Sequence, residues 1–326
     1  MPPKKASPTR VTKGGRLGHG PRWTAFEAWN SDRTTKEVIP GTVCKQINSF
    51  YADPRRWAKN GNPERPRKST LPKTEDIDVS DCISNRARLA IAEPIFRADT
   101  KYCWTCFQCG RQPDDPECDF SCYDEIHSGG GSKSMNNFFR KWLEIRHTGS
   151  EERGYGIFVK STGRYEIPAG SYLGHYIGEI APGPSKGVGG NSNRYLYEPQ
   201  VGPSWDADRP IIDAGKMGNW TRFMNSSCNP NVGECIMQIG KVRVIAFFAN
   251  KTLKSGDELC IYYGDDYFKG HDMLCSCDEY EGKHDPAEVG ASMNAELRQS
   301  ESWAANANMA VSYEESEVES EISEEP

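Results

Sequence analysis

The sequence predicts a compact, mainly β domain that follows a cysteine-rich segment. Short segments rich in β-branched and aromatic residues succeed one another between residues 155 and 263, and Gly or Pro turns separate them. No helix of useful length lies between these segments, so a parallel α/β sheet is not expected. The preceding residues 75–134 hold many cysteines and turn residues and cannot build an apolar core from their own side chains, which indicates a segment organised around metal.

The expected elements follow in chain order. A short helix is expected over Met135–Glu144, which holds several large apolar side chains. Strands are expected after it, at Tyr155–Lys160, Ser171–Ile180, Tyr195–Tyr197, Ile211–Asp213, Gly233–Ile239, Val242–Ala249 and Glu258–Tyr263. Turn residues separate them, for example at Pro168–Gly170 and at Ile239-Gly240.

Charge is unevenly distributed along the chain. Residues 1–25 carry six basic side chains and no acidic one, whereas residues 286–326 carry ten acidic side chains and a single Arg. We expect a basic, largely disordered arm over residues 1–70 and an acidic, disordered tail over residues 286–326. The arm could also contact nucleic acid or act as a nuclear address, and its aromatic residues indicate that part of it docks on another surface.

The cysteines indicate metal binding. The chain has no apolar run long enough for a membrane span and no secretory signal behind Met1–Lys5, so disulfides are not expected among its 12 cysteines. Five cysteines have the spacing C-x2-C-x2-C-x8-C-x3-C, which is typical of zinc knuckles: Cys103, Cys106, Cys109, Cys118 and Cys122. Four or five of these thiols could hold one Zn²⁺ ion, and Cys82 could extend the set to a small cluster. Cys44, Cys235 and Cys260 are interpreted as small packing residues.

Two later segments carry the strongest functional signal. Arg222–Asn231 reads R-F-M-N-S-S-C-N-P-N between two apolar strands, and buried polar side chains of this kind need partners for every polar atom. Glu258–Gly264 reads E-L-C-I-Y-Y-G. The pair resembles the motifs R-F-x-N-H-S-C-x-P-N and E-L-x-F-D-Y-G of the SET-domain protein-lysine methyltransferases. Further motifs stand in the family order, including Arg153–Gly156 and Tyr176–Glu179, and the resemblance covers residues 140–277.

The resemblance implies a SET-domain fold, in which several short sheets surround a threaded, pseudoknot-like C-terminal segment. It divides the chain into a cysteine-rich pre-SET-like segment (75–134), a SET domain (140–265) and a degenerate post-SET segment (266–285). Within the family, the motifs are closest to the histone H3 lysine-9 group.

The resemblance also implies that S-adenosylmethionine is the cofactor. The residues expected to bind it are Gly154, Tyr155, Gly156, Tyr195, Arg222, Phe223, Asn225 and Ser226. Asn225 offers a carbonyl acceptor and an amide donor, and the two glycines permit close backbone approach. Ser226 stands where the family has histidine, so it can keep a backbone contact but has no imidazole. A turn-capping Asn225 and a plain glycine turn are the alternatives without a ligand.

Tyr263 and Tyr176 are expected to be the catalytic residues and to form walls of a lysine channel. A lysine amine has a pKa of about 10.4 and must lose its proton before it accepts a methyl group. A desolvated channel lowers that pKa, and a tyrosine hydroxyl can orient the neutral amine; Tyr176 could instead merely pack on its strand. Ile261 and Tyr262 are expected in the substrate channel. Ile261 replaces Phe or Tyr and favours di- or trimethylation, whereas Tyr262 replaces Asp for no reason that we can give.

A second zinc site is implied after the β domain. In the family, the cysteine of N-x-S-C, here Cys228, joins three later cysteines in the pattern C-x-C-x4-C. Cys275 and Cys277 match the first two, but Gly282 stands at the third position. Structural zinc is four-coordinate, so His284 could complete the set. The alternative is that no zinc binds and the segment stays loosely closed.

The sequence therefore predicts a nuclear, chromatin-associated enzyme that methylates a protein lysine, on a histone tail or on another lysine-containing protein. The alternative is a catalytically inactive SET-fold module that binds chromatin or a peptide. Membrane association is not expected. Sequence-specific DNA contact is not expected either, because the body of the chain is mildly acidic and holds no DNA-binding motif.

Overall fold

The structure is a computed structural model that describes residues 25–39, 44–47, 50–52, 105–112, 115–128, 135–163, 166–182, 195–197, 210–240, 242–292 and 294–295. Its helices are α3 (Phe120–Ser128), α4 (Met135–Trp142) and α5 (Asp265–His271), with one 3-10 turn at Trp220–Phe223. Its strands are β1 (Phe26–Trp29), β2 (Lys36–Ile39), β3 (Lys45–Gln46), β4 (Tyr51–Ala52), β5 (Leu143–His147), β6 (Tyr155–Val159), β7 (Glu166–Ile167), β8 (Tyr172–His175), β9 (Glu179–Pro182), β10 (Leu196–Tyr197), β11 (Pro210–Asp213), β12 (Met217–Gly218), β13 (Asn225–Ser226), β14 (Val232–Ile239), β15 (Val242–Ala249), β16 (Leu253–Lys254) and β17 (Glu258–Ile261).

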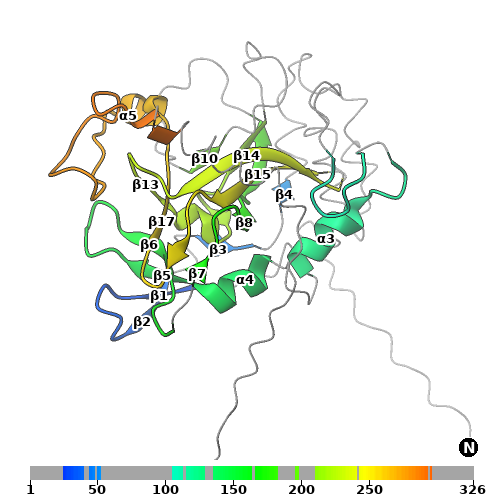
Figure 1. Ribbon diagram of the computed structural model, residues 1–326, viewed down its shortest axis with the longest axis horizontal. Helices are drawn as coiled ribbons and strands as arrows, with labels where there is room; N and C mark the ends of the chain where they lie inside the picture. The colour runs from blue at the N-terminus through cyan, green and yellow to red at the C-terminus, as the bar shows by residue number, and fades with distance from the viewer. Residues whose placement is uncertain are drawn as a thin grey trace, which may run out of the picture.

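The described strands form several small sheets, which occupy the centre of the molecule in Figure 1. The largest has the order β13-β17-β6-β5-β1-β2, and a second has the order β10-β11-β9-β4. The hairpin β14–β15 is the longest pairing and continues into β8, and β12-β3 and β16-β7 form two short pairs. The prediction of a mainly β fold built from short sheets is confirmed.

Strand β17 lies between two strands that precede it in the chain. It runs antiparallel to β6 and parallel to β13, where Asn225 pairs with Cys260 and Ser226 with Ile261. The C-terminal strand is thus inserted into the sheet, as a threaded C-terminal segment requires. This pairing brings the two motifs of the sequence side by side.

One apolar cluster joins the sheets. Trp220, Phe247 and Leu259 are fully buried in it, and Phe139 of α4 stacks on Trp220 with ring centroids 5.4 Å apart. β15 is rich in β-branched and aromatic residues, most of which are buried in this cluster, and such residues favour a long strand. None of the described helices is long and apolar enough to span a membrane.

Two expected elements have different boundaries in the structure. Ser171–Ile180 is two strands, because β8 pairs with β15 whereas β9 pairs with β11, and the chain changes sheet at Tyr176–Gly178. A Cβ atom at Gly178 would lie only 2.5 Å from the carbonyl oxygen of Asp213, so the close approach there requires glycine. The helix expected up to Glu144 ends at Trp142, because Leu143–His147 pairs with β6.

Both chain ends contribute more to the fold than their composition indicates. Within the expected N-terminal arm, β1 and β2 extend the largest sheet, and Phe26 is buried and contacts Phe223 edge to face at 4.9 Å. Within the expected acidic tail, Ala291 is fully buried beside the C-terminal cysteines. Tertiary contacts therefore override the polar composition at both places. Residues 1–24, 40–43, 48–49 and 53–70 of the arm, and residues 293 and 296–326 of the tail, lie outside the described residues.

Replacing Phe26 by Ala tests whether the N-terminal hairpin is part of the folded domain. We expect a loss of about 3–5 kcal/mol in the free energy of unfolding, because the change empties a buried aromatic site. Urea denaturation of the zinc-loaded protein measures this. Val38→Ala is the control, since Val38 of β2 is 60% exposed and should change stability by less than about 0.5 kcal/mol. Equal effects of the two variants would show that β1 adds nothing to the core.

Candidate functional site

A cleft of about 280 Å³ opens between the end of β13 and the segment that follows β17. Seven of the eight residues expected to bind a cofactor line it: Gly154, Tyr155, Tyr195, Arg222, Phe223, Asn225 and Ser226. Gly156 does not line it, because it is buried in β6, where a Cβ atom would lie 3.0 Å from the carboxyl carbon of Glu258. Ile39 of β2 and a group of C-terminal residues complete the wall: Tyr267, Phe268, Met273 and Leu274.

Asn225 is held by hydrogen bonds at the base of this cleft. Its Nδ2 amide donates to the carbonyl oxygen of Tyr155 at 3.2 Å and to Oε1 of Glu258 at 2.8 Å. Glu258 Oε2 lies 2.5 Å from Nη2 of Arg153. Burial raises the pKa of the Glu258 carboxyl, while Asn225 and Arg153 favour its charged form. The side-chain orientation of Asn225 is thus set by an ion pair, which a simple turn cap would not need.

Arg222 orients the aromatic edge of the cleft. Its Nε donates to the carbonyl oxygen of Ala214 at 2.9 Å, and its guanidinium lies 3.9 Å from the ring centroid of Tyr195 and 4.9 Å from that of Phe223. Arg222 is buried, so this cation is stabilised by the carbonyl and the ring faces. Its side chain therefore supports the cleft wall.

Both tyrosines that are expected to be catalytic are hydrogen-bonded; Tyr176 is buried and Tyr263 is half-buried. Tyr263 lines the cleft, and its hydroxyl donates to the carbonyl oxygen of Met224 at 2.7 Å. Tyr176 does not line the cleft, and its hydroxyl donates to the carbonyl oxygen of Tyr195 at 2.9 Å. Burial raises the pKa of Tyr263 and of Tyr176 well above the usual tyrosine value. Both side chains are neutral hydroxyl groups at physiological pH.

The structure also locates the three departures from the family motifs. Ser226 Oγ accepts a hydrogen bond from the backbone N–H of Tyr263 at 3.3 Å, so the serine holds the backbone of Tyr263 in place. Ile261 is buried in the main apolar cluster, and Tyr262 donates a hydrogen bond to Asp265 and packs against the C-terminal cysteines. Neither Ile261 nor Tyr262 lines the described cleft.

Sequence reasoning missed Arg153 and Tyr267, which line the cleft, and Glu258, which holds the Asn225 side chain. Arg153 and Glu258 stand inside motifs of the family, but the ion pair between them is visible only once β6 and β17 are paired. Tyr267 contacts Tyr263 edge to face at 4.7 Å, and its position after the Y-Y-G motif was the available signal.

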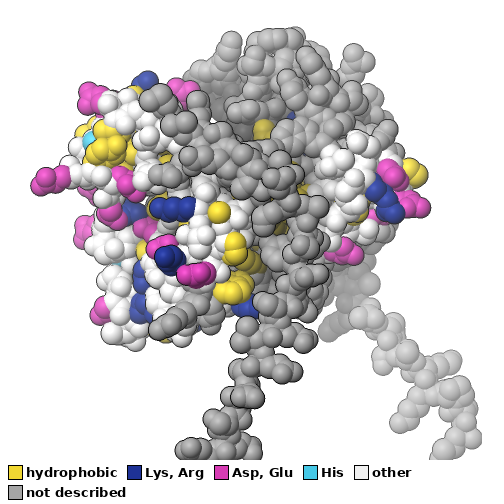
Figure 2. Space-filling model, viewed as in Figure 1, with side chains coloured by type: hydrophobic (Ala, Val, Ile, Leu, Met, Phe, Trp, Pro, Cys, Tyr) yellow, Lys and Arg dark blue, Asp and Glu magenta, His cyan; other side chains and the backbone are white. Residues whose placement is uncertain are grey.

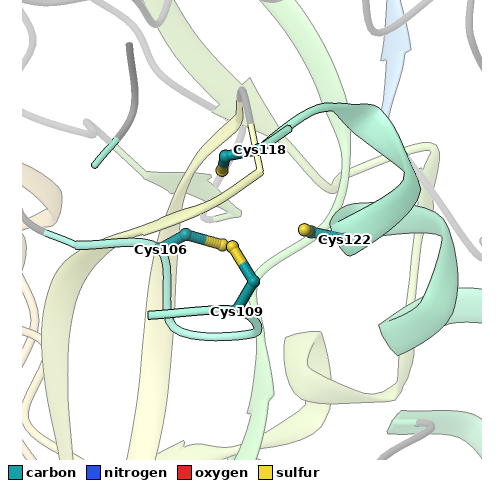
Figure 3. A group of neighbouring side chains, drawn as sticks. All are labelled: Cys106, Cys109, Cys118 and Cys122. Atoms are coloured by element: carbon teal, nitrogen blue, oxygen red, sulfur yellow. The ribbon is translucent and has the colours of Figure 1, made fainter. Parts of the chain in front are cut away.

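Four of the five knuckle cysteines converge at one point. The Sγ atoms of Cys106, Cys109, Cys118 and Cys122 all lie within 4.8 Å of one another, and Figure 3 shows these side chains pointing inward from the 105–112 loop, from the segment just before α3 and from the first turn of α3. Burial raises the pKa of the Cys122 thiol, and a bound divalent cation would stabilise its thiolate. The set fits tetrahedral zinc. Cys103 and Cys82 lie outside the described residues.

This cluster is attached to the β14–β15 hairpin. The backbone N–H of Gly240, in the hairpin turn, donates to Sγ of Cys106 at 3.1 Å, and Phe107 N–H donates to the carbonyl oxygen of Gln238 at 2.9 Å. The Phe107 ring packs on Tyr172 of β8 at 5.0 Å. The cysteine segment therefore folds onto the sheet through both backbone and ring contacts.

The second cluster contains His284, which the sequence suggested as one possible fourth ligand. One ligand atom from each of Cys228, Cys275, Cys277 and His284 lies within 4.8 Å of the others. His284 Nε2 is 3.2 Å from Sγ of Cys228, and a pair of backbone hydrogen bonds joins Cys275 to His284. A hydrogen bond from Cys275 lowers the pKa of Cys277, which favours the thiolate form that binds a cation. The set fits a Cys₃His zinc site. The two clusters lie on opposite sides of the molecule, near α3 and α5 (Figure 1).

The two clusters in the described part of the chain predict that these residues bind two zinc ions per chain. Cys122→Ala and His284→Ala should each remove one ion, because a structural zinc site needs four ligands. Elemental analysis of dialysed, tag-free protein measures the ratio. Cys235→Ala is the matched control, since Cys235 lies in β14 outside both clusters and should leave the ratio unchanged. A His284→Ala protein that keeps the wild-type zinc content would show that the C-terminal cluster binds none.

Comparison with known proteins agrees with the motif order. The sequence model of the SET domain family matches residues 74–264, more than half of the chain. The chain is 24% identical over 217 residues to "Histone-lysine N-methyltransferase, H3 lysine-36 specific" of Mycosarcoma maydis, which covers 64% of this chain and 20% of that protein. It is 31% identical over 166 residues to "Histone-lysine N-methyltransferase NSD3" of Mus musculus, which covers 48% of this chain and 11% of that protein. The chain thus spans about a fifth or less of the length of these relatives.

Among solved structures, Arabidopsis thaliana SUVH6 in complex with SAM is similar with 25% identity and a TM-score of 0.34, over 44% of this chain and 33% of that chain. Several relatives are named for lysine-36 of histone H3. The family match covers more than half of the residues. The chain belongs to the SET domain family.

Proposed function

We propose that this protein transfers a methyl group from S-adenosylmethionine to the side-chain amine of a protein lysine. The observation that carries the proposal is the position of Tyr263, which lines the cleft together with Asn225 and Ser226 and whose hydroxyl is held by the carbonyl oxygen of Met224. The relatives that are named histone-lysine N-methyltransferases support the same chemistry.

The cleft suits a ligand with one aromatic and one charged part. Its volume of about 280 Å³ is near the lower end of the roughly 300–1,000 Å³ that is typical of small-molecule sites. Tyr155, Phe223 and Phe268 offer ring faces that can stabilise a sulfonium, and Asn225 and the backbone near Gly154 offer polar partners. S-adenosylmethionine, when bound, supplies the electrophilic methyl group.

The protein residues have two tasks in this reaction. The substrate amine must release a proton to solvent before the transfer, and the aromatic part of the cleft beside Tyr263, Tyr267 and Phe268 provides the low-polarity surroundings that favour its neutral form. Tyr263 cannot take that proton as a phenolate, because its own pKa is raised well above the usual value. The Tyr263 hydroxyl therefore orients the amine, while Met224 and Ser226 hold the tyrosine in position.

The inactive-module alternative rested on three departures from the family pattern. Ser226 still contacts Tyr263, Tyr262 has a hydrogen-bond partner in Asp265, and His284 stands with the three C-terminal cysteines. Each departure thus has a structural partner, which supports an active enzyme over a decayed one.

A basic, histone-like tail is the substrate that we propose, with a nuclear, chromatin-associated location. Acidic side chains gather on the part of the surface that carries α5 and the segment after it (Figure 2). Those that are exposed there include Asp266, Asp272, Asp278, Glu279 and Glu281. Opposite charge favours encounter with a lysine- and arginine-rich partner.

Tyr263→Phe should lower the rate of methyl transfer by about 100-fold or more while leaving cofactor affinity nearly unchanged, because it removes one positioned hydroxyl. Transfer of labelled methyl groups to histone H3 peptides measures the rate, and calorimetric titration with S-adenosylhomocysteine measures affinity. Tyr280→Phe is the control, since Tyr280 is 40% exposed and lies outside the cleft. Full activity of Tyr263→Phe would contradict its assigned role.

Asn225→Ala should weaken binding of S-adenosylhomocysteine by about tenfold or more, because it removes a hydrogen bond to the buried Glu258 carboxylate. The same calorimetric titration measures this. A folded, zinc-loaded wild-type protein that binds a histone peptide but no cofactor would overturn the proposal in favour of a peptide-binding module.

A further inference from the structure

The guanidinium of Arg153 connects two parts of the chain. Its Nη2 lies 2.5 Å from Oε2 of Glu258 in β17, and its Nη1 lies 2.7 Å from Oδ2 of Asp278, in the segment after α5. The Arg153 and Glu258 side chains are 9% and 13% exposed, whereas that of Asp278 is 87% exposed. One cation thus joins a buried carboxylate to a surface carboxylate.

The buried end of this connection reaches the cofactor cleft. Glu258 Oε1 accepts the hydrogen bond from Asn225, and the same Asn225 amide donates to the carbonyl oxygen of Tyr155. Glu258 is also held through its backbone, because its carbonyl oxygen accepts from Nδ2 of Asn231 at 2.7 Å. A displacement of Arg153 would therefore shift the Glu258 carboxylate and, through it, the Asn225 side chain.

The exposed end reaches the C-terminal metal cluster. Asp278 directly follows Cys277, one of the four clustered ligands, and both Arg153 and Cys277 line the cleft. The loop that carries Asp278 is held elsewhere mainly by the cluster itself and by surface contacts such as Lys283 with Glu152. The position of Asp278 relative to Arg153 thus depends on whether the cluster is closed around a metal ion.

We propose that Arg153 is a positioning residue that couples the C-terminal Cys₃His centre to the cofactor cleft, so that zinc and cofactor strengthen each other's binding. The inference rests on the proposed function, because it needs a cofactor in the cleft. Metal binding at the centre fixes the position of Asp278. The carboxylates of Asp278 and Glu258 then hold the Arg153 guanidinium, and the Glu258 carboxylate holds the Asn225 amide. Linkage makes the effect reciprocal, so cofactor must increase zinc affinity by the factor by which zinc increases cofactor affinity.

The relative strengths of the two ion pairs predict graded effects. Asp278→Asn removes an exposed pair, so S-adenosylhomocysteine binding should weaken by about two- to fivefold. Arg153→Met leaves the Glu258 carboxylate buried without its cation, so the loss should be about tenfold or more. Asp278→Glu keeps the charge and should restore most of the affinity.

The test uses the full, zinc-loaded chain. Calorimetry gives the affinity for S-adenosylhomocysteine, and equilibrium competition with a chromogenic chelator gives zinc affinity with and without that ligand. Cys275→Ser identifies which zinc belongs to the C-terminal centre, and the Cys106 centre is the internal reference. Glu281→Gln is the matched control, because Glu281 is an exposed carboxylate of the same segment outside the cleft and both clusters.

In the wild type, S-adenosylhomocysteine should raise zinc affinity at the C-terminal centre alone. Asp278→Asn and Arg153→Met should reduce that increase, and Asp278→Asn should add nothing in the Arg153→Met background. Should Arg153→Met fail to fold, Asp278→Asn at the surface still decides the question. Wild-type coupling in Asp278→Asn would overturn this inference and leave the proposed function intact. A folded wild type that binds no S-adenosylhomocysteine would overturn both.

Discussion

The insertion of β17 between β13 and β6 is the constraint on which the rest of the structure depends. The parallel pairing of Asn225 with Cys260 and of Ser226 with Ile261 joins segments more than thirty residues apart. It places Glu258 beside Asn225, and it places Tyr263 where Met224 and Ser226 can hold its hydroxyl and its backbone. Without this pairing neither the cleft nor the buried ion pair of Arg153 would exist.

The same insertion decides where the C-terminal segment closes. Cys228 follows β13, and Cys275 and Cys277 follow α5, so the threaded arrangement brings these thiols to one point. The apolar cluster there is small, with Phe268 and Ala291 as its main non-cysteine members. A core of this size contributes little free energy, so four metal ligands are a reasonable means of holding the segment over the cleft. The cluster of Cys106, Cys109, Cys118 and Cys122 holds its own segment with metal ligands in the same way, on the opposite side of the molecule, where it contacts the turn of the β14–β15 hairpin.

The chemistry of the site depends on neutral groups in surroundings of low polarity. Burial keeps Tyr263 and Tyr176 protonated, and the nearby charges of Arg222 and Arg153 are matched by carbonyls, ring faces and carboxylates. Such a site can stabilise a methyl donor by ring faces and favour an uncharged amine by desolvation, without a strong base. The need to match each buried charge also explains why Asn225 is tied to an ion pair that reaches the surface at Asp278.

The sequence by itself determined the mainly β fold, the order of the motifs and most of the cleft. Alternating apolar residues and turn glycines are local signals, and cysteine spacing is fixed by the geometry of a metal ion, so both can be recognised without a structure. The resemblance to the SET family, rather than any of these local patterns, identified the expected cofactor residues, seven of which line the cleft. Only the tertiary structure decided that Gly156 packs against Glu258, that Ile261 and Tyr262 do not line the described cleft, and that His284 joins Cys228. It also decided that the polar N-terminal residues supply β1 and Phe26 to the core. These outcomes depend on pairings between distant segments, whose free energy comes from burial and charge matching that no local pattern encodes.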